Sequence, residues 1–177
     1  VPAWLAQKWP LASRPLAAAV GFLVLLPAGL ALVHLREVKP LLLLAAMAAV
    51  WVADIAAYFA GRRFGRRKLA PAISPGKTWE GAAGALAGVL IYGLSLAALD
   101  GRLSGLGFAG TAAFALWLAL VTAVSILGDL FASLMKRQAG LKDSGSLLPG
   151  HGGVLDRIDS QTSALPLVGL LVLYWRH

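Results

Sequence analysis

The amino-acid sequence predicts an all-α, polytopic integral membrane protein with about five transmembrane helices and a long cytoplasmic catalytic loop. Hydrophobic residues make up 59% of the 177 residues and charged residues only 14%, against roughly 25% charged residues in a typical soluble protein. The mean hydropathy is +0.76. The apolar residues are grouped in runs of about 20, which is the length that crosses the hydrocarbon core of a bilayer. The chain has no cysteine, which excludes disulfides and thiolate metal sites.

We expect the membrane-spanning helices over residues 15–35, 40–61, 80–99, 109–135 and 161–175, of which the last is the shortest. Because no internal repeat is present, residues 1–177 are interpreted as a single membrane-embedded domain. Glycines of the third span, such as Gly81, Gly84 and Gly88, have the spacing that lets helices pack closely in lipid. Ser74 and Pro75 are residue types of a helix N-cap and first turn, so we expect the third helix to begin there.

Positive charge is concentrated in two of the segments that connect the expected helices. Residues 62–79 contain six Lys and Arg residues and residues 136–160 contain four, whereas the other connections hold only Arg36, Lys39 and Arg102. The positive-inside rule therefore places both basic segments, and the N-terminus with them, in the cytoplasm. The net charge of +8 follows from this topology and from anionic substrates, so we expect no nucleic-acid partner.

Two carboxylates interrupt otherwise apolar spans. Asp54 lies eight residues before Arg62, and Asp129 lies seven residues before Lys136. At a rise of 1.5 Å per residue, both lie about 10–12 Å below the cytoplasmic boundary. A carboxylate in a membrane costs about 2.5–3.5 kcal/mol on insertion scales, so each is a candidate functional residue. We expect them to line a polar cavity open to the cytoplasm; the alternative is that each pairs with a basic residue for packing alone.

The segment from Lys136 to Asp159 combines cations, carboxylates and a glycine-rich turn. Gly150, Gly152 and Gly153 surround His151, and such glycines allow backbone N–H groups to face a phosphate. Asp156 and Asp159 lie three residues apart and would share one face of a helix. Oxygen ligands are the only plentiful kind here, and they favour Mg²⁺. The alternative interpretation is a solvated basic linker.

The run SLMKRQAGLKDSGSLLPGHGGVLDRID, residues 133–159, resembles the signature of the phosphatidate cytidylyltransferase family. The segments DIAAY, residues 54–58, and SPGKTWEG, residues 74–81, resemble the family's earlier conserved stretch. The resemblance covers roughly residues 51–159. Family members are usually longer at the N-terminus, so the resemblance implies that further N-terminal helices are missing here or dispensable. The matching signature positions are Ser133, Lys136, Arg137, Lys142, Asp143, Pro149, His151, Gly152, Gly153, Asp156, Arg157 and Asp159.

The resemblance implies transfer of CMP from CTP to phosphatidate, which gives CDP-diacylglycerol and pyrophosphate for phospholipid biosynthesis. It implies Mg²⁺, with a second cation left open, at an intramembrane centre held by Asp129 and Asp156. Asp54 and Asp159 are further candidate ligands. It also implies a homodimer among membrane lipids, and we expect it in a bacterial inner membrane with the active site facing the cytoplasm.

Candidate roles for the remaining residues follow from their charge. Lys142 is a catalytic candidate, and Asp143 either orients it or contacts cytidine. His151 either donates a hydrogen bond to a phosphate or supports the turn, and Gly152 and Gly153 offer backbone N–H groups. The candidates for binding the triphosphate or the lipid phosphate are Lys77, Lys136, Arg137, Lys142 and Arg157.

Two other classes of function stay open at this point. One is a CTP-dependent lipid kinase, or a cytidylyltransferase that acts on another lipid phosphate. The other is an ion-coupled or proton-coupled transporter with Asp54 and Asp129 as a midplane site. The transporter is disfavoured because the polar residues cluster in one loop on one side of the membrane.

Overall fold

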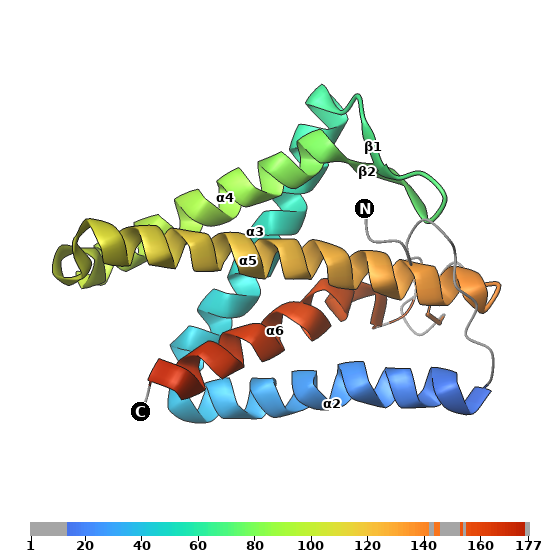
Figure 1. The fold of residues 1–177 in the computed structure, drawn as a ribbon, viewed down its shortest axis with the longest axis horizontal. Helices are drawn as coiled ribbons and strands as arrows, with labels where there is room; N and C mark the ends of the chain where they lie inside the picture. The colour runs from blue at the N-terminus through green and yellow to red at the C-terminus, as the bar shows by residue number, and fades with distance from the viewer. Residues whose placement is uncertain (1–13, 142–143, 146–152, 154, 176–177) are drawn as a thin grey trace.

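The computed structural model describes residues 14–141, 144–145, 153 and 155–175 of the chain (Figure 1). Within these residues, the elements in chain order are helix α2 Arg14–Val38, helix α3 Pro40–Phe64, strand β1 Lys68–Ala70, strand β2 Ser74–Thr78, helix α4 Trp79–Leu99, helix α5 Arg102–Gln138 and helix α6 Leu155–Trp175. The predicted all-α membrane fold is confirmed. Four of the helices are long and apolar enough to cross a membrane, and Ile158–Leu173 of α6 is a shorter apolar helix.

The helix boundaries follow local backbone chemistry. Pro40 occupies the first turn of α3, where its missing N–H leaves no helical hydrogen bond unmade. Between α4 and α5, Gly101 has a φ of 71°, a conformation that glycine adopts without steric cost. Gly107, with a φ of 61°, interrupts the helical geometry inside α5, close to residue 109 where the sequence predicted the fourth span to begin.

The helices form a bundle with two ends. The β1–β2 hairpin and the C-terminal end of α5 lie toward one end, and the α2–α3 and α4–α5 junctions lie toward the other (Figure 1). Lys136 and Arg137, in the last turn of α5, lie toward the same end as the hairpin; the side of the membrane on which this end lies stays a prediction. The central core joins α2, α3, α5 and α6 through the buried residues Ala31, Leu35, Leu43, Val50, Val121, Ala164, Leu165 and Val168.

Helices α3 and α4 pack closely because glycines of α4 meet alanines of α3. A Cβ atom on Gly84 would lie 2.3 Å from the Cβ of Ala60, and one on Gly88 would lie 2.8 Å from the Cβ of Ala56. A side chain at either position would therefore push the two helices apart. The predicted packing role of these glycines is confirmed.

The hairpin between α3 and α4 was not predicted from the sequence. Strands β1 and β2 pair antiparallel, with Lys68 opposite Thr78. The prediction that α4 begins at Ser74 and Pro75 is wrong: these residues start β2, and α4 begins at Trp79. The N-cap is Thr78, whose hydroxyl accepts a hydrogen bond from the Gly81 N–H at 3.1 Å.

Packing against α5 fixes the hairpin in its extended form. Ile73, at the turn, is only 2% exposed and forms a buried cluster with Ala70 and with Leu130 and Leu134 of α5. The hairpin thus lies over the C-terminal half of α5. This contact brings the loop residues after α3 next to the predicted membrane carboxylate of α5.

Candidate active site

Asp129 lies on α5 beside a lysine from the hairpin. The Lys77 ammonium of β2 forms an ion pair with the Asp129 Oδ2 atom, and the two side chains are only 26% and 23% exposed. One helical turn later, the Ser133 hydroxyl donates a hydrogen bond to Asp129 Oδ1 at 3.5 Å. The sequence singled out all three residues, but it did not predict that Lys77 and Asp129 contact each other.

Close packing of α5 on α6 holds the neighbourhood of Asp129 in place. A Cβ atom on Gly128 would lie 1.9 Å from the Ser163 Oγ atom, so the two helices meet at Gly128. The Ser163 hydroxyl lies 3.2 Å from the Val124 carbonyl oxygen of α5. The N-terminal part of α6 is therefore fixed against the segment of α5 that carries Asp129.

A second ion pair joins the end of α5 to the start of α6. The Lys136 Nζ atom lies 3.6 Å from Asp159 Oδ2, and both side chains are mostly buried. The other carboxylate oxygen of Asp159 accepts the Ser160 N–H at 2.9 Å. Two residues of the predicted signature segment thus contact each other across two helices.

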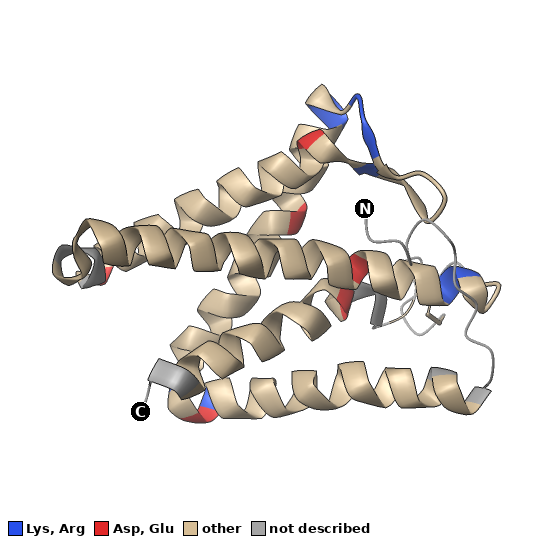
Figure 2. Cartoon of the chain, viewed as in Figure 1, with Lys and Arg blue, Asp and Glu red and all other residues tan. Residues whose placement is uncertain are grey.

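Asp54 of α3 belongs to the same charged cluster. Its carboxylate interacts electrostatically with Asp129, Lys77 and Asp159, and it lies beside the Ser160 hydroxyl. Asp129 and Asp159 also interact with each other, and Figure 2 shows acidic positions where α5 and α6 run side by side. The sequence placed Asp54 and Asp129 at one depth; that they line a polar cavity open to the cytoplasm stays a prediction. Three carboxylates and two lysines from α3, β2, α5 and α6 therefore form one site, which we call the charged centre (Asp54, Lys77, Asp129, Lys136 and Asp159).

Several predicted site residues fall where the structure does not describe them. Lys142, Asp143, His151 and Gly152 lie outside the described residues. Asp156 and Arg157 belong to the first turn of α6, with backbone positions only. The backbone places Asp156 one turn before Asp159, as the spacing predicted. The roles proposed for these side chains, and the pairing of Asp156 with Asp129, stay predictions.

The two remaining site residues are described. Gly153 is buried, and a Cβ atom on it would lie 2.2 Å from the Ser144 Oγ atom. Any larger residue would displace the backbone of the loop there. Arg137, in the last turn of α5, is exposed, so its guanidinium is accessible to an anionic ligand.

The charged centre contains the oxygen donors that Mg²⁺ prefers, but its acids are not gathered around one point. The described side chains in contact with Asp129 are those of Lys77 and Ser133, and Asp54 and Asp159 interact with it electrostatically. Across the described part of the chain, no group of three or more His, Cys, Asp or Glu side chains is arranged to hold a metal ion. Lys77 and Lys136 instead neutralise part of the negative charge. Of the metal-ligand candidates, Asp54, Asp129 and Asp159 have described side chains.

The fold and the charged centre define a helical membrane protein with ionisable groups placed between its spanning helices. Residues 6–175 match the sequence model of the cytidylyltransferase family. The chain therefore belongs to the cytidylyltransferase family, which confirms the resemblance seen in residues 133–159.

The chain is also similar to several bacterial proteins named phosphatidate cytidylyltransferase. It is 51% identical over 156 residues to the Pseudomonas aeruginosa protein, which covers 86% of this chain and 56% of that protein. The Haemophilus influenzae protein is 48% identical over 125 residues, with 71% and 43% covered. The Synechocystis protein is 43% identical over 136 residues, with 72% and 42% covered. The chain spans about half the length of the curated relatives it matches.

Proposed function

We propose that the protein transfers CMP from CTP to phosphatidate and releases CDP-diacylglycerol and pyrophosphate. The observation that carries this proposal is the charged centre, in which Lys136 and Asp159 of the signature segment join the membrane carboxylates Asp54 and Asp129. Membership of the cytidylyltransferase family and the names of the relatives support it. The lipid-kinase and transporter alternatives have no such support.

The reaction requires alignment and charge neutralisation more than acid–base chemistry. A phosphate oxygen of phosphatidate attacks the α-phosphorus of CTP, a new P–O bond forms, and the bond to the leaving pyrophosphate breaks. The attacking phosphate is already an anion near neutral pH, so no strong general base is needed. The protein's contribution is to hold two polyanions together and to offset their charge.

The lysines of the charged centre are among the described groups that could carry out this neutralisation. Lys77 and Lys136 are each paired with a carboxylate in the structure. The Lys77 ammonium contacts the membrane carboxylate Asp129, and the Lys136 ammonium contacts Asp159 of the signature segment. A bound triphosphate or lipid phosphate would offer them a second anionic partner at the point where the reacting groups must meet.

We further propose that Asp129 and Asp156 hold Mg²⁺, with Asp54 and Asp159 as further ligand candidates and with a second cation left open. When bound, the metal would neutralise charge on the phosphates and orient them for displacement. The hard oxygen donors of Asp129, Asp54 and Asp159 support this assignment. Lys77 would then neutralise the charge of the Asp129 carboxylate when no metal ion is bound.

The surroundings of the protein are proposed on the same basis. Large apolar side chains on the outer faces of the helices are exposed, among them Phe22, Leu23, Leu99, Phe108 and Leu116, and lipid tails would cover them. We propose a bacterial inner membrane, with the charged centre reached from the cytoplasm, and a homodimer as in the family. Crosslinking of the purified protein in lipid nanodiscs tests the dimer.

The activity is tested by incubating the purified chain in lipid micelles with phosphatidate and CTP labelled at the α-phosphate. The proposal expects label in CDP-diacylglycerol and an equal amount of pyrophosphate. A lipid kinase would release CDP and phosphorylate the lipid, and a transporter would give neither product; either result would overturn the proposal. Other lipid phosphates and dCTP, assayed in parallel, define the substrate class.

A further inference from the structure

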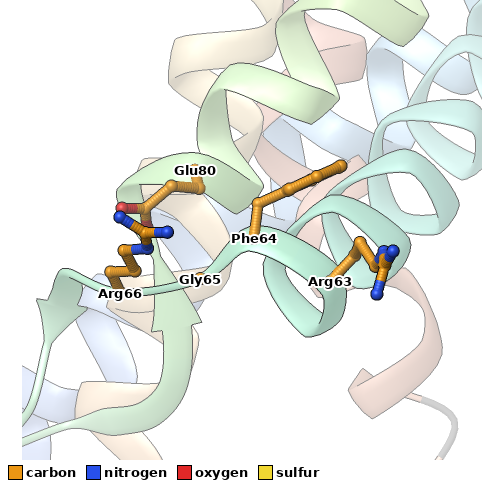
Figure 3. Close-up of a pocket in the computed structure, with 5 residues that line it drawn as sticks. All are labelled: Arg63, Phe64, Gly65, Arg66 and Glu80. Atoms are coloured by element: carbon orange, nitrogen blue, oxygen red, sulfur yellow. The ribbon is translucent and has the colours of Figure 1, made fainter.

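A pocket opens at the end of the α3–α4 pair, away from the charged centre. It has a volume of about 500 Å³ and is lined by Arg63, Phe64, Gly65, Arg66 and Glu80. Figure 3 shows Arg66 beside Glu80, with Phe64 and Arg63 on the other side of Gly65. None of the charged-centre residues lines this pocket, so the proposed nucleotidyl transfer leaves it without a role.

The backbone beneath the pocket is held closely. A Cβ atom on Gly65 would lie 2.2 Å from the Gly61 carbonyl oxygen and 2.9 Å from the Thr78 methyl carbon. One on Gly61 would lie 3.0 Å from the Thr78 Oγ1 atom. The end of α3 and the N-cap of α4 are therefore packed directly against each other, and the side chains around Gly65 are carried by a fixed frame.

The pocket lies within the most cationic stretch of the chain. Five of the seven residues from 62 to 68 are Arg or Lys. Arg62 is directed back along α3, because its guanidinium donates a hydrogen bond to the Tyr58 hydroxyl at 2.8 Å. Arg63 and Arg66 are exposed and line the pocket itself. Figure 3 shows these two exposed side chains on opposite sides of Gly65, directed away from each other. Each guanidinium provides planar donors of the kind that bind phosphate oxygens.

The single carboxylate in the lining is already engaged. Both carboxylate oxygens of Glu80 lie 3.3 Å from the Arg67 backbone N–H, which donates to them. This contact anchors the loop after α3 to the first turn of α4. Because the lining contains one negative charge, Glu80, and two positive charges, Arg63 and Arg66, it keeps a net positive charge and favours an anion.

The same pocket has an apolar side at the depth where two membrane helices end. α3 ends at Phe64 and α4 begins at Trp79, and both helices are long and apolar enough to span a bilayer. Phe64 is 65% exposed and Trp79 is 52% exposed. Aromatic side chains at helix ends typically lie at the head-group level of the membrane. Of the two rings, Phe64 lines the pocket together with Arg63 and Arg66, so the pocket has both an apolar and a polar surface.

We propose that this pocket binds the head-group phosphate of an anionic phospholipid, with Arg63 and Arg66 on the phosphate and Phe64 against the adjoining glycerol and acyl chain. The site is separate from the catalytic centre and goes beyond the proposed function. It would hold a lipid at the cytoplasmic rim of the α3–α4 pair, where the positive-inside topology places the basic segment next to anionic lipids.

Phosphatidylglycerol is a suitable probe, because its phosphodiester has no free phosphate group that could attack CTP. Retention of this lipid by the purified protein, measured by native mass spectrometry, is compared with retention of phosphatidylcholine. The test variant is Arg63→Gln with Arg66→Gln. The matched control is Arg36→Gln with Lys39→Gln, which removes two exposed cations from the α2–α3 junction at the other end of the bundle.

The proposal expects preferential retention of phosphatidylglycerol by the unchanged chain and by the control. In the test variant, retention of phosphatidylglycerol should fall by at least about five-fold, which is the effect of one interfacial cation. Phe64→Ala should weaken retention without altering the charge of the pocket. Equal retention by test and control variants, or equal retention of phosphatidylcholine, would overturn the site. Displacement of the lipid by millimolar glycerol 3-phosphate would overturn its assignment to a lipid and indicate a soluble phosphate ligand.

Discussion

Lys77 and Asp129 form an ion pair although 52 residues separate them in the chain. The lysine comes from the hairpin after α3, and the aspartate lies within the long apolar helix α5. A membrane carboxylate is costly to bury alone, and the ammonium group reduces that cost. The pair links the hairpin to the charged centre, so its two partners allow separate tests of stability and of activity.

The first prediction concerns the role of Asp129 in the reaction. Asp129→Asn should abolish CMP transfer, because the amide keeps the volume of the side chain but loses the charge that a metal or a lysine requires. The measurement is turnover of the purified variant, with Glu37→Gln as a control at an exposed acid of α2. An ion pair with a packing role alone would leave more than about a tenth of the turnover, which corresponds to under 1.4 kcal/mol of barrier.

The second prediction concerns Lys77 as the counter-ion of Asp129. Lys77→Met should lower the free energy of unfolding by about 1–3 kcal/mol, because it leaves a partly buried carboxylate without its charged partner. Adding Asp129→Asn to Lys77→Met should restore part of the loss, since the uncompensated charge is then removed.

Thermal unfolding in detergent, with and without Mg²⁺, measures this effect without any substrate. If Mg²⁺ can take the place of Lys77 beside Asp129, it should raise the unfolding temperature of Lys77→Met more than that of the unchanged chain. Equal stability of Lys77→Met and the unchanged chain would show that the ion pair contributes nothing. Strictly additive losses in the double variant would show that the two residues act independently.

The third prediction concerns the side of the membrane on which the hairpin lies. The chain has no cysteine, so single cysteines can be placed at the exposed positions Ala72, in the hairpin turn, and Ala139, after α5. In spheroplasts, an impermeant thiol reagent should fail to label either position until the membrane is opened. Glu37→Cys, near the α2–α3 junction, should be labelled at once. Labelling of Ala72→Cys or Ala139→Cys in intact spheroplasts would contradict the positive-inside assignment.

The helices and the membrane carboxylates could be predicted because they depend on local patterns. Runs of apolar residues define each span. The similar spacings of Asp54 and Asp129 from the following basic residues, eight and seven residues, placed them at one depth. That placement is consistent with their electrostatic interaction. The glycine spacing in α4 indicated close packing for the same reason, since the pattern lies within a single helix.

The hairpin and the ion pairs could not be predicted because they depend on contacts between distant segments. Ser74 and Pro75 are typical of a helix start, yet burial of Ile73 against Leu130 and Leu134 keeps the segment extended. Only this packing brings Lys77 to Asp129. Nothing in the local sequence around either residue indicates its partner, and a covarying pair in related sequences is the kind of signal that could.

The last prediction concerns cooperation between Asp129 and Asp156. Asp156 lies 27 residues after Asp129 in the chain, in the first turn of α6 and one turn before Asp159. Since Asp159 interacts electrostatically with Asp129, the start of α6 lies next to the part of α5 that carries the membrane carboxylate. If Asp129 and Asp156 hold one metal ion, neither completes the site alone. The losses of turnover caused by Asp129→Asn and Asp156→Asn should then be strongly non-additive.

Asp129→Asn combined with Asp156→Asn should therefore be scarcely less active than either single variant, and each single variant should need more Mg²⁺ for its residual rate. The measurement is transfer of labelled CMP from CTP to phosphatidate over a series of Mg²⁺ concentrations. Asp159→Asn is the comparison, because the Asp159 carboxylate already pairs with Lys136. If Asp159 does not bind the metal, the fold-loss of turnover in the double variant Asp129→Asn with Asp159→Asn should equal the product of the two single fold-losses. Multiplicative losses for Asp129 and Asp156, with an unchanged dependence on Mg²⁺, would mean that the two acids have separate roles and that the shared-metal mechanism is wrong.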